Sequence, residues 1–152
     1  MKIKKIPKKK PVPVGTARIN KDGSKRISVQ SGKSKGRNLQ KLVAKKISDL
    51  LGEPFGPDED IASRPMGQSG CDIRISPRIR KMFPYSIECK NQERFNVVTA
   101  IQQAIENQME GTEWLLVYSK NRFPTVISMD IDHFFKLLQR LQDAKKTSNK
   151  KL

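Results

Sequence analysis

The sequence predicts a single α/β domain, with a central mixed β-sheet flanked by helices and a basic arm in front of it. Three observations support this fold class. The 152 residues suit one hydrophobic core plus tails. Segments of helical period alternate with short apolar segments of strand length, as α/β folds require. Basic residues are concentrated near the N-terminus.

The expected elements follow from hydrophobic period and from capping or turn residues. The first helix has apolar residues at helical spacing and ends at a glycine, and a long loop with several prolines and glycines follows it. In order, the elements are a helix at about 37–51, a loop at 52–69, a strand at 71–76, a basic turn at 78–83, a strand at 85–90, a helix from its cap Asn96 to about Glu110, strands at 114–118 and 124–129, and a last helix from Asp130 or Asp132.

The net charge of +16 is unevenly distributed. Residues 1–46 hold 16 Lys and Arg but one acid, whereas residues 47–152 hold 15 bases and 14 acids. A basic arm therefore precedes a nearly neutral domain. Such an arm predicts a polyanionic partner, above all a nucleic acid, and a solvated solubility tail is the alternative interpretation.

We divide the chain into a basic N-terminal arm (1–34), a domain (35–143) and a basic tail (144–152) that we expect to be frayed. Repelling lysines and three prolines predict disorder at the start of the arm. Apolar alternation around an Asp-Gly pair in residues 16–30 predicts a basic hairpin, with a disordered linker as the alternative.

Cysteine usage and hydropathy exclude two classes of protein. Cys71 and Cys89 form no CxxC or Cys/His cluster, which argues against a zinc site. No apolar run approaches the roughly 18 residues of a membrane-spanning helix. We therefore expect no membrane association and a cytoplasmic location, with both thiols reduced.

The residues that could carry out chemistry lie in GCDIRISPRIRKMFPYSIECK, residues 70–90. Asp72 opens one expected strand, and Glu88 and Lys90 lie two apart on the next, so that both point to one face. A turn joining these strands as antiparallel neighbours would bring Asp72 beside Glu88. Paired carboxylates need a cation between them, and oxygen ligands favour Mg²⁺, with Mn²⁺ as a substitute. By spacing alone, the three could equally be solvated surface residues.

The same stretch resembles the PD-(D/E)xK nuclease superfamily, in particular small phage-encoded members and archaeal-type Holliday junction resolvases. KGRNLQKLVAKKI (35–47) resembles the opening helix, and RPMGQSGCDI (64–73) resembles the lead into the first catalytic strand. NVVTAIQQAIENQ (96–108) resembles the following helix, in which a glutamine faces the site. The resemblance covers roughly residues 35–140 and implies a restriction-endonuclease-like core.

The resemblance also implies the role of each site residue. Asp72 and Glu88 would bind the metal, helped by the backbone carbonyl of Cys89. Lys90 would position the nucleophile or neutralise charge on the phosphate. Gln103, with Gln102 as the alternative, would orient Lys90 or a water.

The chain departs from the family pattern at two places. The glutamate of the opening helix falls at Gln40, an amide that can coordinate a metal without adding charge. Acids of the following loop, Asp58 to Asp60, could replace it. The proline of the motif name is absent, because Gly70 and Cys71 precede Asp72.

These observations predict a Mg²⁺-dependent endodeoxyribonuclease, a hydrolase of DNA phosphodiester bonds. The small basic chain favours a structure-selective Holliday junction resolvase of DNA recombination and repair, which acts as a homodimer because two symmetric nicks need two sites. If it is phage-encoded, it works in the cytoplasm of a bacterial host. The alternatives are a less specific DNA repair or DNA-degrading nuclease and a non-catalytic nucleic-acid-binding protein of the same fold. The expected DNA contacts are Lys33, Lys35, Arg37, Arg74, Arg78, Arg80, Lys81 and Arg94.

Overall fold

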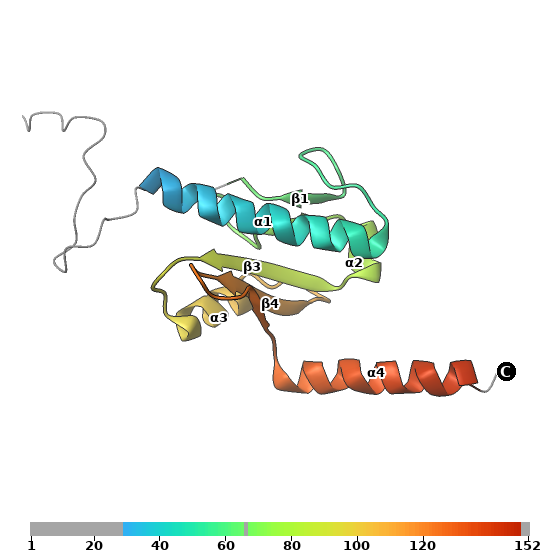
Figure 1. Cartoon of the computed structure of the whole chain (residues 1–152). Coiled ribbons are helices and arrows are strands. Elements are labelled where there is room, and N and C mark those ends of the chain that lie inside the picture. The colour runs from blue at the N-terminus through green and yellow to red at the C-terminus, as the bar shows by residue number, and fades with distance from the viewer. Residues whose placement is uncertain (1–28, 66, 150–152) are drawn as a thin grey trace, which may run out of the picture.

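The computed structural model describes residues 29–65 and 67–149, which form one α/β domain with helices packed on a small mixed sheet (Figure 1). The elements are α1 (Val29–Leu51), β1 (Ile61–Ser63), β2 (Ile73–Ile75), α2 (Pro77–Met82), β3 (Tyr85–Asn91), α3 (Val97–Glu106), β4 (Glu113–Ser119), β5 (Val126–Ser128) and α4 (Ile131–Asn149). The predicted fold class is therefore confirmed at the level of a single domain with a mixed sheet.

Two groups of strands form the sheet layer. Strand β4 lies in the centre of a three-stranded sheet, parallel to β3 and antiparallel to β5. Strands β1 and β2 form a separate antiparallel pair. The Asp72 N–H donates to the Ile87 carbonyl at 2.8 Å and so joins this pair to β3. We predicted that a turn would join β2 and β3 as antiparallel neighbours. That prediction was wrong, because helix α2 lies between them in the chain and β2 pairs with β1.

Helices α1 and α3 cover opposite faces of the sheet (Figure 1). Because strand side chains alternate, Ile87 and Cys89 point toward α1 and meet Leu39 and Val43 in the main core. Glu88, between them, points to the face that α3 covers. A charged side chain is thereby held in the interior, at the junction of the sheet and two helices.

Helix α1 begins at Val29, eight residues before the predicted start, and thus crosses the expected boundary between arm and domain. No proline interrupts residues 29–51, and extending an existing helix costs less than nucleating one. The Ser/Gly/Lys segment at 31–35, which lies across the expected boundary between arm and domain, is consequently helical. Of the predicted hairpin, residues 29 and 30 are helical, and its remaining residues lie outside the described part, as does the arm's start.

Three further elements differ from the prediction. The basic turn at 78–83 is the short helix α2, because Ser76 caps it, Pro77 suits its first turn and Ile79 is fully buried. Strand β1 lies inside the expected loop 52–69, where antiparallel pairing with β2 stabilises it. The tail 144–152 continues α4 to Asn149 instead of fraying at its start.

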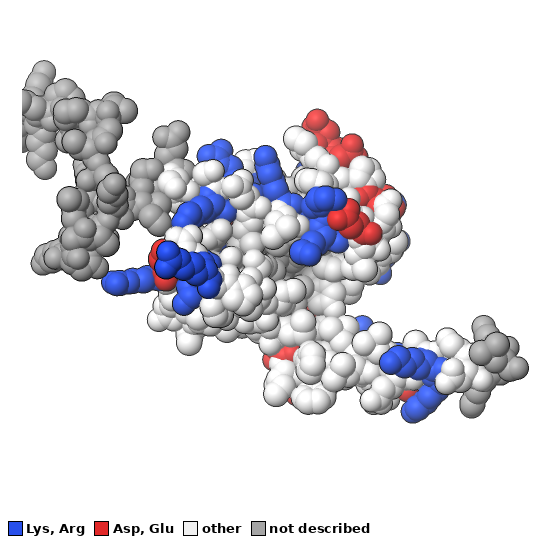
Figure 2. Space-filling view, viewed as in Figure 1, with Lys and Arg blue, Asp and Glu red and all other residues white. Residues whose placement is uncertain are grey.

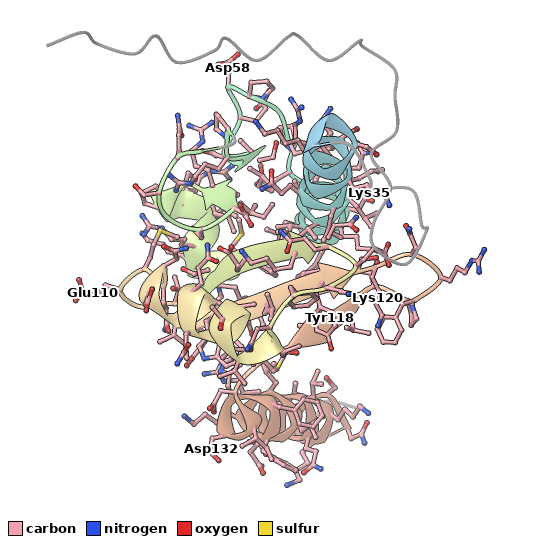
Figure 3. All side chains as sticks on the ribbon, turned by 90° about the vertical axis from the view of Figure 1, so that its left-hand side faces the viewer. Lys35, Asp58, Glu110, Tyr118, Lys120 and Asp132 are labelled. Atoms are coloured by element: carbon pink, nitrogen blue, oxygen red, sulfur yellow. The ribbon has the colours of Figure 1, made fainter. Side chains whose placement is uncertain are left out.

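Helix α4 projects from the domain (Figures 1 and 3). Its first turn is anchored by buried His133, whose Nε2 lies 3.0 Å from the Tyr85 hydroxyl and whose Nδ1 lies 3.4 Å from Glu113 Oε1. This histidine has a structural role, as a lone helical histidine usually does. None of the helices in the described ranges is long and apolar enough to cross a membrane.

Candidate active site

A pocket of about 380 Å³ opens where α1, the segment before β2, the end of β3 and α3 meet. It contains all the residues proposed above for catalysis. Its lining comprises Gly32, Lys33, Gly36, Gln40, Pro65, Gly67, Gln68, Gly70, Asp72, Glu88, Cys89, Lys90, Asn91, Gln92 and Gln103. Residues separated by more than sixty positions in the sequence therefore share one cavity.

Backbone contacts hold Asp72 at the floor of this pocket. Arg64 donates from its main-chain N–H to the Asp72 carbonyl at 2.7 Å and from its Nε to the Cys71 carbonyl at 2.7 Å. Its guanidinium also lies against Gly70, whose φ of +97° a proline could not adopt. Arg64 thereby fixes the backbone that leads into Asp72.

Both carboxylate oxygens of Asp72 accept hydrogen bonds. Oδ2 accepts from the Cys89 N–H and Oδ1 accepts from Gln40 Nε2, each at 2.7 Å. Burial, and after it the negative charge of Glu88, raises the pKa of Asp72 above its usual value. The charge of Lys90 and the two hydrogen bonds offset this shift only in part, and a bound divalent metal would further favour the ionised carboxylate.

A chain of polar side chains fixes Glu88 and Lys90 on the α3 side of the sheet. The Lys90 Nζ lies 2.7 Å from Glu88 Oε1 and 2.7 Å from Gln103 Oε1. Asn107 Nδ2 donates to the other Glu88 oxygen at 3.3 Å. Glu88 is only 3% exposed, so Lys90 provides the charge that compensates its burial.

Helix α3 presents Gln103 to Lys90, whereas Gln102, the alternative considered above, does not line the pocket. Both glutamines are exposed. Sequence reasoning missed Asn107. The signal was present, since Asn107 lies four residues after Gln103 and therefore on the same helix face.

Cys89 contributes its backbone rather than its thiol. The side chain is buried among the apolar residues of the other face, and this burial raises the pKa of the thiol. A residue in a strand directs its N–H and its carbonyl to the same edge. Because the Cys89 N–H bonds Asp72, its carbonyl also faces the Asp72 side of β3.

Gln40 is a further side chain of the pocket with an oxygen atom that could coordinate a metal. It is 4% exposed, and its Oε1 has no hydrogen-bond partner among the described residues, although its Nε2 bonds Asp72. A buried carbonyl oxygen without a partner lowers the stability of the fold, so a bound ligand at this oxygen would be stabilising. The described residues contain no cluster of three or more His, Cys, Asp or Glu suited to a metal. The oxygen donors available to Mg²⁺ are therefore two carboxylates, the Gln40 amide and the Cys89 carbonyl.

Replacing Gln40 with glutamate tests this donor set. The new carboxylate would lose the hydrogen bond to Asp72 and lie about 3 Å from it, so we expect Gln40→Glu to lower the unfolding temperature in EDTA. With Mg²⁺ or Mn²⁺ present, the added charge should enlarge the metal-induced rise in unfolding temperature relative to the wild type. Thermal unfolding with and without metal measures both effects. An equal metal-induced rise in the two proteins would remove Gln40 from the site.

Contrary to the expectation above, the acids Asp58 to Asp60 do not take the place of a glutamate at position 40. They do not line the pocket, and Asp58 lies at the tip of a loop on the far side of α1 from the sheet (Figure 3). Asp60 binds Arg78 at 2.6 Å. Figure 2 shows the acidic side chains of this loop gathered at one end of the molecule. Asp60 holds the loop through Arg78, which also binds both oxygens of Glu53.

The proposed DNA-contacting residues are in different environments. Arg74 and Arg78 bind carbonyls or carboxylates of the 53–60 loop, which engages their guanidinium groups within the domain. The Nε atom of Arg80 is buried without a partner in the described residues. Lys33 lines the pocket, Lys35 bonds Asn121, Arg37 and Lys81 are exposed, and Arg94 lines a second, neighbouring pocket. Of the group, Lys33 is the residue that lines the pocket of Asp72, Glu88 and Lys90.

Two glycines of α1 are also part of the site. Gly36 and Gly32 lie one and two turns before Gln40, and a Cβ built at either position would meet no atom within 4 Å. The helix therefore presents a smooth backbone surface at the mouth of the pocket. Sequence analysis had placed Gly32 in the basic arm and Gly36 in the segment that resembles an opening helix, and had assigned neither to the site.

Comparison of the chain with protein-family models, curated proteins and solved structures found no match.

Proposed function

We propose that this protein is a metal-dependent endonuclease that hydrolyses DNA phosphodiester bonds. The observation that carries the proposal is the convergence of Asp72, Glu88, Lys90 and Gln103 around one pocket, with Glu88 buried and Lys90 held by both Glu88 and Gln103. A set of solvated surface residues would not include a carboxylate that is only 3% exposed. The excess of basic residues supports a polyanionic substrate.

In this proposal Asp72, Glu88, the Gln40 amide oxygen and the Cys89 carbonyl hold Mg²⁺, for which Mn²⁺ can substitute. The bound metal supplies Lewis-acid chemistry and lowers the pKa of a water. Lys90 presents its ammonium group to the scissile phosphate and stabilises the charge that develops there. Gln103 orients that ammonium group, and Asn107 orients Glu88.

The finer fold assignment is part of the same proposal. The opening helix α1, the strand pair ending at Asp72, the strand β3 with Glu88 and Lys90, and the glutamine helix α3 occur in the order that the resemblance implies. This order supports a restriction-endonuclease-like core. The open backbone at Gly32 and Gly36 supports close approach of a DNA strand to the pocket.

As substrate we propose a branched DNA, in first place a four-way Holliday junction, cut during recombination or repair. Symmetric nicks need two active sites related by a two-fold axis, hence a homodimer. The projecting helix α4 supports such an assembly. A helix without a packing partner is marginal in water, yet this one exposes Phe134, Phe135, Leu138 and Leu141. We propose that the same face of a second copy covers these side chains.

A cleavage panel tests the substrate. The full chain is incubated with four-way junction, flap, linear duplex and single-stranded DNA, with Mg²⁺ or with EDTA, and light scattering gives its mass. We expect paired symmetric nicks in the junction, little cutting of linear duplex, no cutting in EDTA, and a mass of two chains. Equal cutting of all substrates would indicate a less specific nuclease. Binding without cleavage in both Mg²⁺ and Mn²⁺ would indicate a non-catalytic nucleic-acid-binding protein.

A further inference from the structure

A second pocket, of about 680 Å³, lies beyond the C-terminal ends of β3 and β4. Three aromatic rings line it: Phe95, Tyr118 and Phe123. Phe95 and Tyr118 pack edge to face with centroids 5.4 Å apart, and Phe123 is 41% exposed although it is large and apolar. Aromatic surface open to a cavity of this size favours a flat, stacking ligand.

The charged groups around this pocket are predominantly cationic. Arg94 and Lys120 line it, and no carboxylate pairs with either among the described residues. The Lys120 Nζ lies 5.0 Å from the centroid of the Phe123 ring, which orients both side chains. The one acid in the lining, Glu93, accepts from the Asn121 N–H at 3.1 Å and lies 3.9 Å from the Lys35 Nζ. The pocket therefore combines stacking surface with cations available to an anion.

The pocket adjoins the candidate active site. In the parallel ladder Tyr118 is the register partner of Lys90, so their side chains share a face about one strand spacing, roughly 5 Å, apart. Figure 3 shows Tyr118, Lys120 and Lys35 on the same side of the molecule. A DNA strand with a phosphate at Lys90 would have a neighbouring nucleotide at this pocket.

We propose that this aromatic pocket binds an unpaired base of the DNA strand, stacked on Phe123 or Tyr118, with Arg94 and Lys120 contacting the flanking phosphates. Aromatic stacking on every base type, combined with backbone-tracking cations, is the general chemistry of single-strand binding. A paired base inside a duplex has no free face to offer. The substrate would therefore expose an unpaired nucleotide beside the cut, as the centre of an opened junction or a flap base does. The position relative to the cut rests on the proposed nuclease function, whereas the binding of an unpaired base does not.

Binding in EDTA tests the pocket without any cleavage. The probe is an oligothymidylate of roughly 12 nucleotides with one central 2-aminopurine, compared with its duplex. We expect Phe123→Ala to weaken single-strand binding about tenfold and to reduce quenching of the 2-aminopurine, with duplex affinity unchanged. Phe123→Trp should preserve both signals, and Phe123→Leu, which keeps apolar bulk without a ring, should lose them.

Phe55→Ala is the matched control, because Phe55 is 39% exposed and lies on the loop after α1. It should bind both probes like the wild type. Equal single-strand affinity of Phe123→Ala and wild type, or equal losses on single strand and duplex, would overturn the proposal. The two proposals fail separately. Intact Mg²⁺-dependent cleavage with no Phe123 effect removes only the base pocket, whereas Phe123-dependent binding without cleavage of any DNA removes only the nuclease.

Discussion

Asp72→Ala should reduce metal-dependent DNA cleavage by at least roughly 10³-fold while leaving DNA binding intact. Asp72 has no positive charge with which to bind a phosphate. Its removal takes a negative charge out of a pocket that would receive DNA. Affinity for DNA in EDTA should consequently stay equal or rise slightly. The substitution also leaves Gln40 Nε2 and the Cys89 N–H without their acceptor, so we expect a loss of stability alongside the loss of the metal site.

The measurement is single-turnover cleavage of a labelled four-way junction, with binding followed by anisotropy on the same DNA. Asp58→Ala is the matched control, since that acid is exposed at the tip of a distant loop (Figure 3). It should cleave like the wild type. Cleavage by Asp72→Ala within a few-fold of wild type would contradict the catalytic assignment. Loss of both cleavage and binding would show that Asp72 acts through folding instead.

Lys90→Met should destabilise the protein by about 3 kcal/mol in EDTA, because it leaves Glu88 buried without its ion pair. The Lys90 side chain is 20% exposed and Glu88 is 3% exposed, so solvent screens this pair little. Removing the charge as well, in Lys90→Met combined with Glu88→Gln, should recover most of the lost stability. Urea unfolding measures the free energy of unfolding of each variant.

Metal dependence separates a structural ion pair from a metal site. If Glu88 binds Mg²⁺, the metal supplies the missing positive charge, and Mg²⁺ should restore more stability to Lys90→Met than it adds to the wild type. The control is Lys45→Met, which breaks an exposed pair with Asp49 and should change stability by less than about 0.5 kcal/mol. No extra stabilisation of Lys90→Met by Mg²⁺ or Mn²⁺ would contradict Glu88 as a ligand.

Local pattern predicted the elements that surround the site. The strand at 85–90, the helix capped by Asn96 and the strand at 114–118 occur where side-chain period and capping placed them. Two-residue spacing on a strand was enough to put Glu88 and Lys90 on one face. These features depend on neighbours in the sequence, which is why local reasoning succeeded. Strand β1, which needs its distant partner β2, was missed, and so was the short helix α2, whose Ile79 is buried by the rest of the fold.

The sequence by itself determined the α/β class, the basic N-terminal third and the shared face of Glu88 and Lys90. These features follow from hydrophobic period and charge, which depend only on residues close together in the sequence. Only the tertiary structure decided what completes the pocket. It placed Gln40 rather than Asp58 to Asp60 beside Asp72, since a helix thirty-two residues away packs against β3. It also engaged Arg78 in ion pairs and set Tyr118, one of the three rings of the second pocket, beside Lys90. Such choices depend on which distant segments meet, and packing across the sheet settles them.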